Sequence, residues 1–173
     1  MEKRIFKEEN NLYQFDFSNA VWATDELNQM YRKISSILSD VDFIAETDQE
    51  IIFMEYKNAD VENAANPGAF VQKLKSDEHY RSIALKYYGS ILYALVSGRN
   101  KPYRYVYVLE CAAAGSTERL RIRTKIRSKL PFDLQNGQEF SRRLIEDFEI
   151  LSIEEWNNNP IYGRFPITAI ASS

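Results

Sequence analysis

The chain has 173 residues, a length typical of one domain with its own hydrophobic core. Hydrophobic residues make up 45% of it and charged residues 27%, the balance of an ordinary globular protein. The formal net charge of −3 argues against a dedicated nucleic-acid coat protein, because such proteins carry a basic surplus, although an enzyme with a local basic patch stays open.

The residue inventory excludes several kinds of site. A lone histidine, His79, rules out a multi-histidine metal site, and a lone cysteine, Cys111, rules out a CxxC zinc site and an internal disulfide. The glycines form neither a phosphate-binding loop nor a dinucleotide fingerprint. A triad through His79 stays open, although no G-x-S-x-G elbow supports it. Hydrolytic chemistry would therefore rest on carboxylates, lysine and a hard cation such as Mg²⁺.

The sequence gives no sign of a membrane segment or of secretion. No apolar run approaches the about 20 residues of a membrane span. Residues 1–9 lack the apolar core of a signal peptide. Together with the single cysteine, this predicts a cytoplasmic protein that makes no membrane contact.

The first part of the chain combines extended and helical patterns. Residues 12–17 alternate apolar and polar side chains and indicate a short extended segment. Apolar residues at helical spacing predict a helix over about 20–38, with acidic residues in its first turn. Residues 41–46 and 51–57 are rich in strand-forming side chains and predict a β-hairpin with a polar turn between them.

The middle of the chain holds the most regular helical pattern. The polar stretch 58–68 ends in Asn-Pro-Gly and predicts a loop. Residues 77–97 carry an apolar stripe at helical spacing, and Gly98 is a good stop. Residues 103–111 are apolar on both faces, as in a central strand. Residues 116–130 leave strand and helix open, because basic residues recur at every second position while the isoleucines fit a helical face; helix is favoured.

The last part of the chain is less regular. Residues 138–146 indicate a short helix and 148–153 a strand, and no clear period is visible beyond 157. The order helix, hairpin, helix, strand, helix, strand predicts an α/β (α+β) fold with a mixed sheet. Neither a repeat nor a linker divides the chain, so residues 1–173 are expected to form a single domain.

The charged end of the second hairpin strand holds the candidate site. Glu55 and Lys57 flank Tyr56 at the end of an apolar run, so their side chains share one face of the strand. A turn symmetric about residues 48–49 places Asp42 opposite Glu55, with Cβ atoms about 4.5–5.5 Å apart. Two carboxylates this close repel each other unless a cation lies between them. A register slip of one residue would put them on opposite faces.

This arrangement suits phosphodiester hydrolysis. A hard cation held by carboxylates lowers the pKa of bound water and stabilises charge on the phosphoryl oxygens. A nearby ammonium group, such as that of Lys57, orients the water or offsets the transition-state charge. The ordinary alternative is a solvent-exposed ion pair between Glu55 and Lys57, worth about 0–1 kcal/mol.

Asp42 followed by Glu55-Tyr56-Lys57, on a hairpin between two helices, resembles the PD-(D/E)XK nuclease superfamily. The resemblance implies a restriction-endonuclease-like three-layer core, a central mixed β-sheet flanked by helices, over about residues 20–112. Residues 113–173 would then be a C-terminal helix, strand and tail. The proline of the family's name is Val41 in this sequence.

The resemblance also implies roles for these residues. Asp42, Glu55 and the backbone carbonyl of Tyr56 would hold Mg²⁺ or Mn²⁺, and Lys57 would be the catalytic lysine. The family often adds a glutamate from its first helix.

Accessory residues follow from the same resemblance. Glu26 is the candidate for the first-helix glutamate, with Asp25 as the second choice. The ordinary alternative for Glu26 is a first-turn acid that suits the helix dipole. Lys86 occupies the helix after the hairpin, where some members carry an assisting polar residue.

The implied function is a Mg²⁺-dependent endonuclease that acts on nucleic acid, with DNA favoured over RNA and a homodimer open. The alternative is an inactive nuclease-fold module that binds protein or nucleic acid, which the acidic net charge favours. The basic residues of 119–129 are interpreted as a solvated face rather than a phosphate contact. His79 is expected on a helix surface, and Cys111 and Trp156 in the core.

Overall fold

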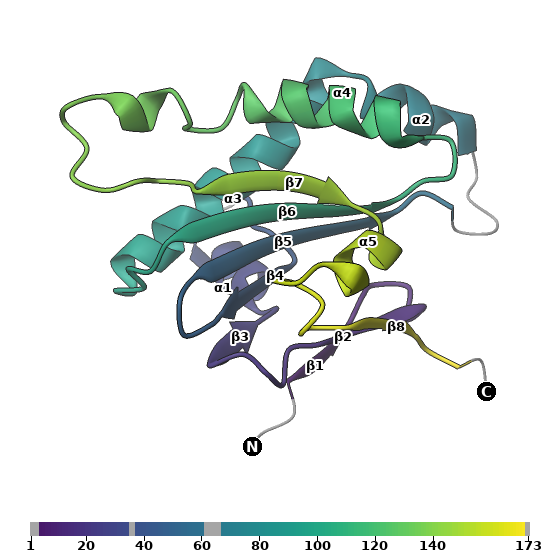
Figure 1. The fold of residues 1–173 in the computed structure, drawn as a ribbon, viewed down its shortest axis with the longest axis horizontal. Helices are drawn as coiled ribbons and strands as arrows, with labels where there is room; N and C mark the ends of the chain where they lie inside the picture. The colour runs from purple at the N-terminus through teal and green to yellow at the C-terminus, as the bar shows by residue number, and fades with distance from the viewer. Residues whose placement is uncertain (1–3, 35–36, 61–66, 172–173) are drawn as a thin grey trace.

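A computed structural model describes residues 4–34, 37–60 and 67–171 of the chain (Figure 1). The strands in these ranges are β1 (Ile5–Lys7), β2 (Tyr13–Asp16), β3 (Trp22–Thr24), β4 (Phe43–Glu46), β5 (Ile51–Asn58), β6 (Tyr103–Glu110), β7 (Asp147–Leu151) and β8 (Ile167–Ala169). The helices are α1 (Leu27–Ile34), α2 (Pro67–Leu74), α3 (Asp77–Val96), α4 (Ser116–Arg127) and α5 (Ile153–Asn158), with a 3₁₀ turn, η1 (Leu134–Asn136).

The larger sheet is mixed, as the sequence predicts. Its strand order is β3-β4-β5-β6-β7. The pairs β3–β4 and β4–β5 are antiparallel, whereas β5–β6 and β6–β7 are parallel. β6 is an inner strand whose side chains are almost all buried, which explains its apolar residues on both faces. The fold is therefore a mixed α/β structure built on a five-stranded sheet.

One face of this sheet is covered by helices α1 to α4 (Figure 1). Their apolar side chains pack with those of alternate strand positions into one core, which includes Tyr31, Phe53, Tyr87, Tyr105 and Ile122. Packing of this kind, in which every second strand residue faces the helices, is what orders the layer. None of the helices in the described ranges is long and apolar enough to cross a membrane.

The opposite face is covered by the small sheet β1-β2-β8 and by α5. Its core is rich in aromatic side chains, among them Phe15, Phe17, Phe43 and Trp156. Because β2 pairs with both β1 and β8, segments from the two ends of the chain meet in one sheet. The expectation of helices flanking the central sheet thus holds on one face, while a sheet and one short helix cover the other.

The hairpin β4–β5 has the register that a symmetric turn predicts. Phe43 pairs with Met54 and Glu46 with Ile51. The Thr47 side chain fixes the turn, because its Oγ1 accepts the N–H groups of Gln49 at 3.1 Å and Glu50 at 2.9 Å. Continuing this register by one residue places Asp42 opposite Glu55.

The predicted helix over 20–38 is wrong at its start. Trp22–Thr24 pair with Ile44–Glu46 as β3, and the helix in the described residues is limited to Leu27–Ile34. Tertiary pairing with the hairpin outweighs the local helical spacing here. Residues 35 and 36 lie outside the described residues.

The loop predicted over 58–68 ends earlier than expected, because Pro67 begins α2. Proline suits the first position of a helix, whose N–H would have no partner in the helix anyway. Residues 61–66 of that prediction lie outside the described residues. The open choice for 116–130 is settled as a helix, α4, whose Ile122 and Ile126 are buried.

Two predictions for the C-terminal part are wrong. Residues 138–146 contain no helix. The N–H groups of Leu144 and Ile145 are satisfied instead by Oε1 of Gln135, at 2.9 and 3.0 Å. The region beyond 157, where no period is visible, contains β8, which pairs with β2.

The contact of α3 with the segment before β4 positions the start of the hairpin. A Cβ atom on Gly89 would lie only 1.7 Å from the backbone oxygen of Ser39, so only glycine permits this approach. The hydroxyl of Tyr31 donates to the Gly89 carbonyl at 2.5 Å, and the N–H of Val41 donates to Ser90 Oγ at 3.0 Å. These contacts fix the residues that lead directly into Asp42.

Candidate functional site

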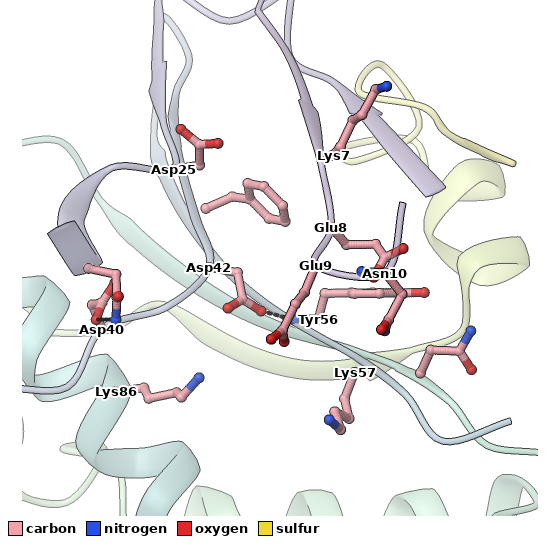
Figure 2. A pocket seen from close by; sticks show the side chains of 13 residues that line it. Lys7, Glu8, Glu9, Asn10, Asp25, Asp40, Asp42, Tyr56, Lys57 and Lys86 are labelled. Atoms are coloured by element: carbon pink, nitrogen blue, oxygen red, sulfur yellow. Dashed lines mark hydrogen bonds between the residues drawn. The ribbon is translucent and has the colours of Figure 1, made fainter. Parts of the chain in front are cut away.

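Asp42 lies just before β4, at the point where the backbone of this strand leaves β5. Its Oδ2 accepts the backbone N–H of Tyr56 at 2.8 Å (Figure 2). The carboxylate therefore satisfies a strand N–H that no backbone partner reaches. This bond holds the Asp42 side chain at the end of the hairpin, on the position opposite Glu55.

Glu55 is buried, with only 5% of its surface exposed. Its Oε1 accepts a hydrogen bond from Nζ of Lys86, which α3 supplies, at 2.5 Å. Its Oε2 is buried and has no hydrogen-bond partner among the described residues. Such an unsatisfied buried oxygen is costly for stability and calls for a functional explanation.

Burial and the nearby Asp42 carboxylate raise the pKa of Glu55 to about 8, against the opposing effect of Lys86. Burial also raises the pKa of Asp42, although Lys86 and the Tyr56 N–H oppose this. For Lys86, burial lowers the pKa, but the Glu55 and Asp42 carboxylates outweigh it and raise the pKa overall. The three side chains form one coupled group in which Lys86 supplies the positive charge.

A pocket of about 250 Å³ opens in front of this group. Figure 2 shows its labelled side chains, which come from the β1–β2 connection, the start of the hairpin, the end of β5 and α3. The residues that line it are Lys7, Glu8, Glu9, Asn10, Asp25, Asn28, Asp40, Asp42, Phe43, Tyr56, Lys57, Asn58 and Lys86. Glu55 does not line the pocket itself, but Lys86, which does, contacts it directly.

Lys57 stands at the pocket, on the strand face that the sequence predicts. Its side chain is exposed, and its ammonium lies 5.6 Å from the centre of the Phe70 ring. It is one of the positive charges that lower the pKa of Asp42. Asp42, Glu55 and Lys57 are therefore brought together, with Lys57 as the most exposed of the three.

Glu26 is not brought into this pocket. It lies directly before α1, where its carbonyl accepts the N–H of Met30 at 3.2 Å, and it lines a neighbouring hollow. Asp25, the second choice from the sequence, lines the pocket. Burial raises the pKa of Asp25. The acid contributed next to the first helix is therefore Asp25 by position.

Sequence reasoning gave too little weight to two charged residues of the site. Asp40 is buried, lines the pocket and accepts a hydrogen bond from Asn28 at 3.1 Å. Its neighbourhood in the sequence indicates only a turn. Lys86 interrupts the apolar helix α3 next to Tyr87, and a lysine on the inner side of such a helix is the signal that pointed to it.

His79 is buried, contrary to the expectation of a surface residue. Its Nε2 lies 3.4 Å from the hydroxyl of Tyr107, the residue that pairs with Glu55 across β5 and β6. Burial and nearby lysines lower the pKa of His79 to about 4, so the imidazole is neutral at physiological pH. Cys111 and Trp156 are buried in the core as expected.

The basic residues of 119–129 make ion pairs within the protein. Arg119 bonds Glu155 at 2.7 and 2.8 Å, and Arg123 and Arg127 lie 3.5 and 3.6 Å from Asp147. These contacts give the three arginines a role in joining α4 to β7 and α5.

The donor set fits a hard divalent cation. The unpartnered Oε2 of Glu55, the Asp42 carboxylate and backbone oxygens of β5 are the kind of ligand that Mg²⁺ and Mn²⁺ prefer. Within the described ranges, however, no three His, Cys, Asp or Glu side chains are grouped so that they can hold a metal ion. A cation here would depend on two carboxylates and keep several water ligands, as Mg²⁺ usually does.

Comparison with protein-family models, with curated proteins and with solved structures found no match to this chain. The functional argument therefore rests on the geometry of the site.

The Glu55–Lys86 pair can be tested by a double-mutant cycle at pH 9, where Glu55 is ionised. Lys86→Met should lower the free energy of unfolding by about 3 kcal/mol, because it leaves a buried charge without its partner. Adding Glu55→Gln should recover much of this loss. Urea unfolding measures both, with Lys129→Met as control, since Lys129 pairs with an exposed carboxylate. Additive effects of the two changes would contradict the pairing.

The raised pKa of Glu55 predicts a pH dependence of stability. A carboxyl that binds its proton more tightly when folded stabilises the protein below its unfolded pKa of 4.5 and loses that effect as the pH rises through about 8. The unfolding free energy of the wild type, measured with urea in EDTA, should therefore fall between pH 5 and pH 8 relative to that of Glu55→Gln. A constant difference across this range would show that Glu55 has an ordinary pKa.

Proposed function

We propose that the protein is a metal-dependent nuclease that hydrolyses phosphodiester bonds in nucleic acid, with a restriction-endonuclease-like core. The observation that carries the proposal is the hairpin register, which sets Asp42 beside the buried Glu55. The order of helix, hairpin, helix and strand around it supports the proposed fold. The acidic pair and the neighbouring lysine match the resemblance to PD-(D/E)XK nucleases.

Each residue has a chemical role in this proposal. Asp42, Glu55 and the Tyr56 carbonyl would hold the cation. Bound Mg²⁺ supplies water of lowered pKa and a positive charge beside the phosphoryl oxygens. Lys57, exposed at the pocket, donates to a phosphoryl oxygen or orients the water, and so offsets negative charge in the transition state.

Lys86 has a different part from Lys57. Its ammonium contacts Glu55 at 2.5 Å and partly neutralises the two buried carboxylates. By doing so it lets both acids remain in the protein interior before a cation arrives. Lys57 has no such contact with Glu55 among the described residues, and its charge is directed to the pocket.

A specific observation favours the alternative of an inactive nuclease-fold module for protein or nucleic-acid binding. Lys86 already supplies Glu55 with a positive charge, and three metal-ligating side chains do not come together in the described part of the chain. A cytoplasmic location, a preference for DNA and a homodimer remain predictions from the sequence.

Activity separates the two functions. Purified protein with Mg²⁺ or Mn²⁺ should cut single-stranded or duplex DNA or RNA. Glu55→Gln and Lys57→Ala should each reduce cutting at least about hundredfold, because each removes charge that acts on the transition state. Glu154→Gln, an exposed acid on α5, serves as the matched control. Cutting that persists in both site variants, with circular dichroism unchanged, would overturn the proposed site.

A further inference from the structure

A second hollow, of about 460 Å³, lies next to the candidate site among β1, β3, α1 and α3. Its walls include the aromatic side chains of Phe6, Trp22 and Tyr93, together with the apolar Leu27 and Met30. We refer to it as the Trp22 groove. Apolar and aromatic walls of this kind bind flat organic rings.

The two principal rings of the Trp22 groove are nearly parallel. The ring centres of Trp22 and Tyr93 are 6.4 Å apart, and their planes are inclined by 23°. A flat ring can therefore lie against both. The guanidinium of Arg99 stacks on Trp22, 3.4 Å from the ring centre, and is itself paired with Glu46. This contact holds the indole in a fixed orientation, which lowers the entropy cost of stacking a ligand.

The rim of the groove is polar. Thr24, Asp25 and Glu26 line it on one side and Arg4 on another. Carboxylates accept hydrogen bonds from the N–H groups at the edge of a nucleobase, as they do from the amino group of cytosine. The walls therefore suit the face of a base and the rim suits its edge.

Asp25 lines both the Trp22 groove and the pocket that contains Asp42. The two hollows are therefore neighbours that share one side chain. A nucleotide strand carries its bases at regular short intervals beside its phosphates, so a phosphate in the pocket puts an adjacent base within reach of the groove.

We propose that the Trp22 groove binds an unstacked nucleobase of single-stranded nucleic acid, next to the phosphodiester bond that lies at Asp42 and Glu55. This inference rests on the proposed nuclease function and adds its substrate class. A base in an intact duplex is stacked on its neighbours and cannot enter such a groove, so a single strand or a frayed end is required.

The fluorescence of Trp22 reports on the groove directly. The chain has two tryptophans, and Trp156 is fully buried, so quenching by a ligand comes from Trp22. The probe is an octamer of deoxyadenylate, added in EDTA so that it is not cut, and compared with an abasic octamer of equal length. We expect saturable quenching by the first and about tenfold weaker binding of the second, since stacking of one base is worth about 1–3 kcal/mol.

Variants on one helix provide the matched comparison. Tyr93→Leu should weaken binding of a labelled deoxyadenylate octamer about tenfold, measured by anisotropy. Tyr88→Leu, on the same helix but outside the groove, should leave it unchanged. Equal affinity for the two octamers, an unchanged affinity in Tyr93→Leu, or stronger competition by a tryptophan-containing peptide than by the octamer would each overturn the proposal.

The outcome is separable from that of the nuclease proposal. Base-dependent binding without any cutting in Mn²⁺ would leave the groove established and refute the nuclease. Cutting that needs Glu55 but shows no preference for base-bearing over abasic strands would refute the groove and keep the nuclease.

Discussion

The antiparallel pairing of β4 with β5 sets the position of the charged side chains in the candidate site. With Phe43 opposite Met54, the next position outward puts Asp42 opposite Glu55, and the strand alternation then sends Lys57 to the same face. A one-residue slip would turn the Phe53 and Met54 faces around and expose buried apolar side chains. Core packing on both faces of the sheet and the Thr47 turn therefore fix the site together.

This arrangement concentrates negative charge in a poorly hydrated place. Asp40, Asp42 and Glu55 are all affected by burial, which raises their pKa values, and Lys86 is the cation that opposes this rise in each case. Burying like charges together lowers stability unless a function or a cation offsets it. In our account, Lys86 provides a partial offset and a hard divalent cation would complete it, with the release of protons from the two carboxyls as it binds.

The sequence predicted those parts of the molecule whose signal is local. The hairpin, its register, α3 and β6 follow from strand-forming residues, the symmetric turn and a stripe of helical period. β1, β3 and β8 were missed because each is short and exists only through pairing with a distant segment.

The site shows the same division. Asp42, Glu55 and Lys57 lie on one hairpin, so spacing and alternation were enough to bring them together. Asp25 and Asp40 reach the pocket through the close approach of Ser39 to Gly89 and the bend before β4, which no local pattern encodes. Lys86 comes from α3, and its contact with Glu55 depends on how that helix packs on the sheet.

Calorimetric titration with Mn²⁺ at pH 8 tests the central claim, that the hairpin register creates a cation site, most directly. The account predicts binding of one ion per chain, accompanied by proton release that is visible as a dependence of the heat on the buffer. This binding should be lost in Asp42→Asn and kept in Glu154→Gln. An absence of binding in the wild type, or the same binding in Asp42→Asn, would contradict the account.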